Sequence, residues 1–396
     1  MKKKIFVISS RVPYPLDKGD KLRLYHQLNH LNKEFEIMLV SLSENGENKE
    51  AQIKLNSFVD HVHVIPLKKW KIYINLALGF LGRKPFQVYY FYQRNTHKKI
   101  KSLIESFEPD YIYCQLLRSA EYVKDYHHIP KTLDFQDAFS KGIERRINNE
   151  FWKKPIFEME HKRLLKYENI ILDYFEHHTI ISEEDRNAIF HEKRNSIEII
   201  PNGVDTLYFS ANKEIEKKYD LLFVGNMSYA PNVDAAKYIA NEILPSLLEK
   251  FPQIKILIAG SNPAPEVKKL QSEHIIVSGW MEDIRDAYNQ SSIFIAPMQL
   301  GSGLQNKLLE AMSMELPSIT SKLANKSLKA TDGIHAAVCD SVQDYIKAIE
   351  SIMSNKEMAI KLSENARQFV ADNFSWENSV QKLTSIIQTN PAQRNS

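Results

Sequence analysis

Short apolar runs alternate with segments of helical spacing along the whole chain. In the first half, the apolar runs cover residues 4–9, 35–42, 61–65, 111–114, 132–135 and 179–182. In the second half, they cover residues 196–200, 220–224, 255–259, 275–278, 293–296 and 318–321. This alternation predicts an α/β protein whose parallel sheets are covered by helices on both faces.

The pattern restarts near the middle of the chain, around the turn-forming sequence Pro-Asn-Gly-Val-Asp at 201–205. We therefore expect two doubly wound domains, residues 1–205 and 206–375, each with its own core. A last helix over 376–390 is in a position to pack back on the first domain. Because such sheets bind ligands at the carboxyl ends of their strands, we expect these ends to face one another across a shared cleft.

The composition narrows the class of protein. The net charge of +3 is small for a protein that binds nucleic acid. The two cysteines, Cys114 and Cys339, lie far apart and match no zinc or disulfide pattern, which favours a cytoplasmic protein with reduced thiols. The first apolar run is too short for a signal peptide, and no run reaches the roughly 18 apolar residues of a membrane span.

The segment 301–312, Gly-Ser-Gly-Leu-Gln-Asn-Lys-Leu-Leu-Glu-Ala-Met, carries the strongest chemical signal. Gly301 and Gly303 allow close approach of the backbone to a ligand, and the helix that follows offers free N–H groups to an anion. Lys307 lies in the first helical turn, where the helix dipole disfavours a cation, so a phosphate nearby explains it better. Glu310 shares its face and can accept hydrogen bonds from a ribose diol. The alternative is a surface helix with a Lys–Glu pair.

Three further loops follow strands and contain candidate residues. In the loop 11–23, Gly19 precedes a helix, Asp20 is the expected N-cap, and Lys18, Lys21 and Arg23 add positive charge. The segment 223–234 offers Gly225 and Asn226 as ligand contacts and Asn232 as a helix cap. Each of these loops has an alternative interpretation as ordinary turn or solvated loop structure.

The segment 133–140 places Gln136 and Asp137 beyond another strand, where Asp137 is a candidate for orienting an acceptor hydroxyl or, alternatively, a helix cap. Farther along, Glu158, Glu160 and Glu168 have helical spacing and are expected to be solvated.

Residues 301–320 resemble the donor-site signature of family 4 glycosyltransferases of the GT-B fold, and 11–23 resembles the opening of a bacterial subgroup associated with exopolysaccharide systems. The resemblance implies two Rossmann-like domains that face across a cleft. It implies that Lys307 contacts the donor phosphates, that Glu310 contacts the ribose, and that Gly19 approaches the diphosphate. The donor-binding set that we expect comprises Gly19, Gly225, Asn226, Trp280, Met281, Gly301, Ser302, Gly303, Leu304, Lys307 and Glu310.

The chain departs from the family pattern at several positions. Ser302 stands where many relatives carry a second glutamate, and Glu315 replaces the usual glycine at the end of the helix. Relatives often carry a phosphate-binding arginine after Gly225, and none is present before Lys237. Gln136 fills the place of a histidine that contacts the transferred sugar in many members. Trp280 and Met281 lie where relatives bind the nucleobase, and they are equally candidates for the core.

The implied activity is a retaining transfer of a hexose from a nucleotide-diphosphate sugar to a polysaccharide or lipid-linked glycan in cell-surface polysaccharide synthesis. Lys307, Glu310 and Asp137 are the expected catalytic residues. No cofactor and no metal is expected, because the chain has no Asp-x-Asp pair and no His/Cys cluster. A nucleotide-sugar 2-epimerase of the same fold and a non-catalytic sugar-binding protein stay open as alternatives.

Basic and aromatic residues are interleaved between His61 and Ile104, a stretch without any acidic residue. Its basic residues lie within 68–101, and this composition is typical of a membrane-surface patch. A nucleic-acid surface has the same composition but fits the implied fold less well. We therefore expect peripheral contact with the inner face of the cell membrane. The alternative is a solvated basic face over an aromatic core.

Overall fold

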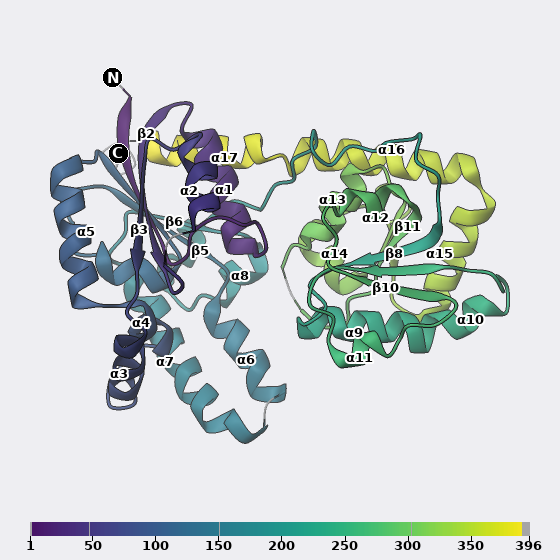
Figure 1. Ribbon diagram of the computed structural model, residues 1–396, viewed down its shortest axis with the longest axis horizontal. Coiled ribbons are helices and arrows are strands. Elements are labelled where there is room, and N and C mark those ends of the chain that lie inside the picture. The colour runs from purple at the N-terminus through teal and green to yellow at the C-terminus, as the bar shows by residue number, and fades with distance from the viewer. Residues whose placement is uncertain (1, 47, 150, 302, 390–396) are drawn as a thin grey trace. The chain divides into compact units, whose positions relative to one another are not determined.

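The structure, a computed structural model, describes residues 2–46, 48–149, 151–301 and 303–389 (Figure 1). The chain forms two compact units. Unit 1 contains Met1–Pro201 and resumes at Ser379, and unit 2 contains Asn202–Asn378. The first segment of unit 1 ends at Pro201, four residues before the domain boundary that we expected after residue 205.

Unit 1 is built on a parallel sheet with the strand order β3-β2-β1-β4-β5-β6-β7. The strands are β1 (Lys3–Ser9), β2 (Phe35–Ser43), β3 (His61–Pro66), β4 (Tyr111–Gln115), β5 (Lys131–Gln136), β6 (His177–Ile180) and β7 (Glu198–Ile199). The strand order reverses between β1 and β4, and in doubly wound sheets this switch point is where ligands bind. Most strand residues are buried on both faces, which explains their nearly continuous apolar sequences.

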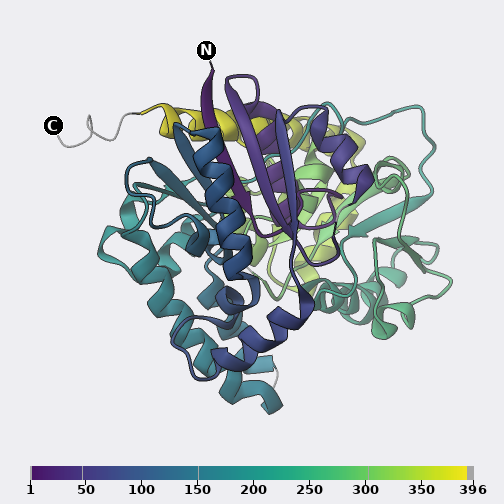
Figure 2. The same cartoon turned by 60° about the vertical axis from the view of Figure 1, so that its left-hand side comes forward.

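Helices cover both faces of this sheet. They are α1 (Gly19–Leu31), α2 (Lys49–Asn56), α3 (Lys69–Gly79), α4 (Phe86–Phe91), α5 (Arg94–Phe107), η1 (Leu117–Tyr122), α6 (Phe139–Asn149), α7 (Lys154–Leu172), α8 (Glu183–Ala188) and α17 (Trp376–Gln388), with short 3-10 turns η2 (Phe151–Lys153) and η3 (Glu192–Ser196). Figures 1 and 2 show α5 along the sheet and α17 beside β1 and β2. The side chains of Val380, Leu383 and Ile386 on α17 belong to the core between this helix and the sheet.

Unit 2 repeats the same architecture with the strand order β10-β9-β8-β11-β12-β13, again with all strands parallel. The strands are β8 (Tyr219–Val224), β9 (Ile256–Ala259), β10 (Ile275–Gly279), β11 (Ser291–Ala296), β12 (Ser318–Ser321) and β13 (Ala337–Cys339). The helices are α9 (Ala230–Tyr238), η4 (Ile239–Ile243), α10 (Leu244–Leu248), α11 (Pro265–Lys268), α12 (Arg285–Asn289), α13 (Asn306–Ser313), α14 (Lys322–Leu328), α15 (Val342–Ser354) and α16 (Lys356–Asn373). Its switch point lies between β8 and β11.

Local geometry corrects three expectations from the sequence. Asp20 does not cap α1, because Lys18 holds the N-cap position and Asp20 lies inside the first turn. Asn232 does not cap α9, which begins after Tyr229. The strand expected over 196–200 is reduced to two residues, because the 3-10 turn η3 takes up its start. In the part of the chain that the structure describes, no helix is long and apolar enough to cross a membrane.

Glu315, just beyond the end of α13, has the backbone conformation that glycine most often supplies at this place in a helix. Its φ of 54° is left-handed. The N–H of Glu315 bonds to the carbonyl of Met312, and the N–H of Leu316 bonds to the carbonyl of Ala311, which together make a Schellman motif. The Glu315 carboxylate pairs with Lys213 at 2.9 Å and Arg367 at 3.6 Å. The turn therefore has its usual form, with a strained residue in it.

Candidate functional site

The loop that follows β11 has the backbone expected of an anion site. Gly301 and Gly303 have φ angles of +100° and +85°, which side chains other than glycine rarely adopt. A Cβ atom on Gly301 would lie 3.5 Å from that of Pro231 at the start of α9, so the loop runs close to that helix. The helix α13 begins directly afterwards without a side-chain cap from Gln305. Its first N–H groups therefore remain suited to a bound anion. Ser302 lies outside the described residues.

Lys307 is a partly buried cation whose hydrogen-bond partner is neutral. Its Nζ donates a hydrogen bond to Oδ1 of Asn232 at 2.5 Å and lies 4.5 Å from the centre of the Phe223 ring. The Sδ atom of Met298 is 3.9 Å away. Burial lowers the pKa of Lys307 to about 7, although the nearby Glu310 opposes this effect. An anion beside Nζ would remove the electrostatic cost of holding this charge in a desolvated place.

Asn232 is a site residue that the sequence interpretation took for a helix cap. Its Nδ2 donates to the carbonyl of Asn226 at 2.9 Å, while its Oδ1 accepts from Lys307. A Cβ atom on Gly225 would lie 2.6 Å from Nδ2 of Asn232, so a larger residue there would displace the Asn232 side chain. Through Asn232 the structure brings Gly225, Asn226 and Lys307 together at the switch point between β8 and β11. In the sequence, the Pro-Asn pair at 231–232 is the only feature that marks Asn232 as a residue of this site.

Glu310 lies one helical turn beyond Lys307 and is held by a buried tyrosine. The hydroxyl of Tyr288 donates to Oε2 of Glu310 at 2.8 Å. Burial raises the pKa of Glu310, and the Tyr288 hydrogen bond and Lys307 both oppose this rise. Tyr288 occupies one carboxylate oxygen. Among the described residues, Oε1 has no hydrogen-bond partner, so it is available to the hydroxyl groups of a ligand.

The loops after β9 and β10 extend this edge of unit 2. The N–H of Gly260 bonds to the carbonyl of Gly279, and a Cβ atom on Gly260 would lie 1.8 Å from the carbonyl oxygen of Gly225. Trp280, which follows Gly279, is 71% exposed and therefore accessible to a ligand. Met281 and Leu304 are only partly exposed, and both pack against the core of unit 2.

In unit 1, the structure brings Gly19 and Gln136 together. A Cβ atom on Gly19 would lie 3.8 Å from Nε2 of Gln136. Gln136 is 92% buried, has a left-handed φ of 61°, and its Oε1 has no hydrogen-bond partner among the described residues. Strained backbone and unpaired buried polar atoms are concentrated at functional sites. Gln136 is therefore the best-supported ligand-facing residue of unit 1.

Asp137 follows Gln136 and is exposed to solvent. Its Oδ2 accepts a long hydrogen bond, 3.4 Å, from Nε2 of Gln136. Although water reaches the side chain, many protein atoms surround the carboxylate. This partial desolvation, followed in size by the effect of the Asp185 carboxylate, raises the pKa of Asp137 to about 7. A carboxylate with a raised pKa suits a group that exchanges a proton or binds a hydroxyl.

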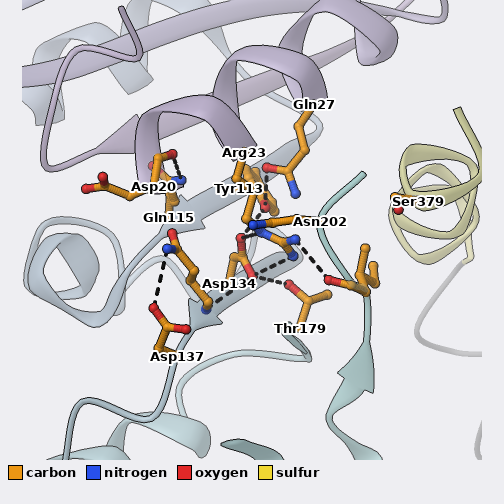
Figure 3. Close-up of polar contacts among 12 residues, drawn as sticks. Asp20, Arg23, Gln27, Tyr113, Gln115, Asp134, Asp137, Thr179, Asn202 and Ser379 are labelled. Atoms are coloured by element: carbon orange, nitrogen blue, oxygen red, sulfur yellow. Dashed lines mark hydrogen bonds and ion pairs between the residues drawn. The ribbon is translucent and has the colours of Figure 1, made fainter. Parts of the chain in front are cut away.

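We expected Arg23 to add positive charge to the loop 11–23, and this expectation is wrong, because its side chain is buried and paired with Asp134. Arg23 is completely buried and binds both oxygens of Asp134, with Nε–Oδ2 and Nη2–Oδ1 distances of 2.7 Å and 3.1 Å (Figure 3). The hydroxyl groups of Tyr113 and Thr179 donate to the same carboxylate at 2.9 Å and 2.8 Å. This buried network fixes the end of β5, and so it positions Gln136 and Asp137.

Two of the three glutamates expected to be solvated are buried instead. Glu160 accepts hydrogen bonds from the N–H groups of Phe86 and Gln87 at 2.7 Å and 3.3 Å, and so caps α4. Glu168 accepts from the N–H of Ser140 at 3.0 Å and holds the start of α6. Burial raises the pKa of Glu168 to about 7. Helical spacing alone gave no sign of these long-range backbone contacts.

Comparison with known proteins adds independent evidence. Residues 218–355 match the family model of glycosyl transferases group 1. The chain is 22% identical to an uncharacterised 44.6 kDa protein in the cps region of Klebsiella pneumoniae, over 94% of this chain and 96% of that protein. It is 24% identical to an uncharacterised glycosyltransferase of Methanocaldococcus jannaschii, over 64% of each chain.

Solved structures share the fold over nearly the whole length. Sucrose-phosphate synthase from Thermosynechococcus elongatus superposes with a TM-score of 0.71 at 13% identity, over 97% of this chain and 98% of that one. Anabaena HepE in complex with UDP and glucose superposes with a TM-score of 0.68 at 12% identity, over 98% and 100% of the two chains. With these matches and its two doubly wound units, the chain is a glycosyltransferase of the GT-B fold that is similar to family 4.

Proposed function

We propose that this protein is a retaining glycosyltransferase that moves a hexose from a nucleotide-diphosphate sugar to a growing cell-surface glycan. The observation that carries the proposal is the arrangement at the switch point of unit 2. There, Lys307 lacks an acidic hydrogen-bond partner among the described residues, and Glu310 keeps one carboxylate oxygen for a ribose diol. The structure of HepE with UDP and glucose supports a donor of this class.

The donor half of the proposed reaction rests on electrostatic stabilisation. As the bond between the sugar and the diphosphate breaks, negative charge develops on the leaving diphosphate. Lys307 and the N–H groups at the start of α13 would stabilise this charge. Such a mechanism requires no metal ion. Trp280, exposed beside the same edge of the sheet, would contact the nucleobase.

The acceptor half is assigned to unit 1. Gln136 would contact the transferred sugar through its unpaired Oε1, and Asp137 would orient the attacking hydroxyl. The relative in a cps region supports a polysaccharide or lipid-linked glycan as acceptor. Gln136 ends β5 and Asp137 follows it, and the Arg23–Asp134 network fixes this strand, so the positions of both groups would be well defined before substrate binds.

A donor-hydrolysis screen with UDP- and GDP-sugars tests the proposal. We expect one donor to be turned over, and we expect Lys307→Ala and Glu310→Ala to lower turnover by about 100-fold or more, as removal of one oxyanion-stabilising donor does. Lys326→Ala removes the same charge from an exposed position on α14 and is the control. Unchanged turnover in both site variants would defeat the site assignment.

The same screen separates the alternatives. A 2-epimerase would convert the donor into its C2 epimer, which NMR of the product identifies, whereas a transferase releases the nucleoside diphosphate. A sugar-binding protein without activity would bind the donor and leave it intact.

The basic segment 68–101 suggests where the protein meets a membrane. Exposed apolar side chains cluster on α3 and the turn after it, namely Trp70, Tyr73, Ile74, Leu78, Phe80 and Leu81. Basic residues flank this segment in the sequence on both sides, namely Lys68, Lys69, Lys71, Arg83 and Lys84. We propose that this apolar face inserts into the surface of an anionic bilayer on the cytoplasmic side, with the basic residues at the headgroups.

Flotation with anionic vesicles at low salt tests this contact. We expect the wild-type protein to float and a Trp70→Ser/Leu81→Ser variant to stay at the bottom. An Ile53→Ser variant, which removes an exposed apolar residue on α2, is the control. A wild-type protein that does not bind anionic vesicles would sink the idea.

A further inference from the structure

A recess with no assigned ligand lies at the switch point of unit 1. Its volume is about 300 Å³. Arg11 reaches it from the segment after β1, and Arg118 reaches it from η1, which follows the neighbouring strand β4. Leu76, Phe86 and Phe91 form an apolar wall. Doubly wound sheets place ligands at this point, so the recess is in the expected position for a substrate.

Arg118 is the residue that points to an anion. Its Nε donates to Oε1 of Gln87 at 2.9 Å, but its buried Nη1 has no hydrogen-bond partner among the described residues. Burial, followed by the like charge of Arg11, lowers the pKa of Arg118 to about 10. A buried guanidinium N–H without an acceptor is costly, and an oxyanion in the recess would satisfy it.

The acidic side chains nearby already have donors. Asp20 accepts from Nη1 of Arg11 at 2.6 Å, and Glu44 accepts from the hydroxyl of Tyr90 at 2.8 Å. Neither carboxylate forms a hydrogen bond or ion pair with Arg118 within the described ranges. The guanidinium of Arg118 instead lies over the rings of Phe139 and Phe91, at 4.7 Å and 5.5 Å.

The apolar wall continues out of the recess. Leu76 lies on α3, the helix with the exposed apolar face. The ring of Phe86 contacts that of Phe80, with 4.9 Å between their centres, and Phe80 is 55% exposed. A ligand with its anionic group at Arg118 therefore has an apolar path along α3. On the other side of the recess, the guanidinium of Arg118 lies over the ring of Phe139, the first residue of α6. Phe139 is two residues after Asp137, so an anion at Arg118 would lie near the proposed acceptor-orienting group.

We propose that this recess binds the phosphoryl end of an amphiphilic acceptor, with Arg118 and Arg11 on the phosphoryl oxygens and an apolar chain running along α3. This inference rests on the proposed function, because it names the acceptor class of the same enzyme. It assigns Arg118 to acceptor recognition and explains how a soluble sugar lacking the phosphoryl group would be rejected.

Binding of farnesyl diphosphate to the purified full chain, without donor, tests the inference by calorimetry. We expect Arg118→Gln to weaken binding by about tenfold or more, the usual effect of losing a charge-assisted hydrogen bond. Arg194→Gln, which removes an exposed charge on η3, should leave the affinity unchanged. Equal affinity in Arg118→Gln and the wild type would overturn the assignment.

Further ligands separate the possible sources of binding. Inorganic pyrophosphate should bind at least tenfold more weakly than farnesyl diphosphate, because it has no apolar chain. Pyrophosphate binding of equal strength would contradict the amphiphile, and displacement of farnesyl diphosphate by UDP would show that the probe occupies the donor site instead. UDP binding measured in parallel reports on the proposed donor site by itself, so failure of one proposal is distinguishable from failure of the other.

A second variant covers the case in which Arg118→Gln does not fold. Leu76→Glu places a negative charge on the apolar wall and leaves every contact of Arg118 in place. We expect it to weaken farnesyl diphosphate binding by a similar factor, with Ile53→Glu on α2 as the matched control. Unchanged affinity in Leu76→Glu would contradict the proposed path of the apolar chain.

Discussion

The ammonium group of Lys307 donates a hydrogen bond to the side-chain oxygen of Asn232 at 2.5 Å, and this contact joins α9, the helix after β8, to α13, the helix after β11. Asn232 is neutral, so it holds Lys307 in place without consuming its charge. We infer that the charge is kept for the diphosphate of the donor.

Replacing this neutral partner tests that inference. Asn232→Asp would supply an internal anion that competes with the diphosphate for Lys307, and we expect UDP to bind about tenfold more weakly, equivalent to roughly 1.4 kcal/mol. Uridine, which has no phosphate, should bind both proteins alike. The comparison by calorimetry would contradict the role of Lys307 if both ligands lost affinity equally.

The affinity for UDP should also depend on pH through Lys307. Its pKa is about 7 without ligand, and only the protonated form attracts the diphosphate. As the pH rises from 7 to 9, more of the free protein must take up a proton to bind, so the Kd should rise by up to about tenfold per pH unit. Lys307→Arg, which stays charged, should flatten this dependence. A flat wild-type profile for UDP would show that Lys307 does not titrate there.

Glu315 offers a test of the strained helix end. The residue is left-handed, so Glu315→Gly should be more stable than Glu315→Ala by about 1 kcal/mol. Both variants lose the same ion pairs with Lys213 and Arg367. The difference between their free energies of unfolding therefore reports the cost of the left-handed backbone alone. Thermal unfolding of the two variants measures it. An alanine variant as stable as the glycine variant would contradict the strain.

The buried pair in unit 1 should be sensitive to the loss of one partner. Asp134→Ala leaves the Arg23 charge buried without its counterion, and we expect a loss of about 3–5 kcal/mol. The double variant Arg23→Met/Asp134→Leu should recover much of this loss, because an apolar pair avoids the desolvation penalty. Denaturant unfolding followed by circular dichroism measures both. A double variant no more stable than Asp134→Ala would argue against an electrostatic origin.

Much of the fold was predictable from the sequence because parallel strands buried on both faces are continuous apolar runs. The strands expected over 220–224 and 318–321 are close to β8 and identical to β12. The short strand β13 was missed, because its three residues are too few to form a pattern. The edge strand β7 is shorter than the expected strand 196–200, because the polar 3-10 turn η3 includes Ser196 and only Glu198 and Ile199 pair with β6.

The candidate site was predictable where glycines and a helix start fix the chemistry, as at Gly301 and Lys307. Residues whose role depends on contacts across the sheet were not. Arg23 appeared to be a ligand-facing charge, since its partner Asp134 lies 111 positions away in the sequence. Glu168 appeared solvated for the same reason, because the N–H of Ser140 that it binds belongs to another helix. Tyr288, which holds Glu310, had no sequence signal at all.

The helix α17 has a consequence for how the chain is made. It contributes Val380, Leu383 and Ile386 to the core of unit 1, although unit 2 separates it from the rest of that unit in the sequence. The ribosome therefore synthesises unit 2 before it synthesises most of α17, the last helix that packs on unit 1. During synthesis, the part of the first sheet that α17 covers stays exposed while unit 2 already has its whole sequence, so unit 2 can finish folding first.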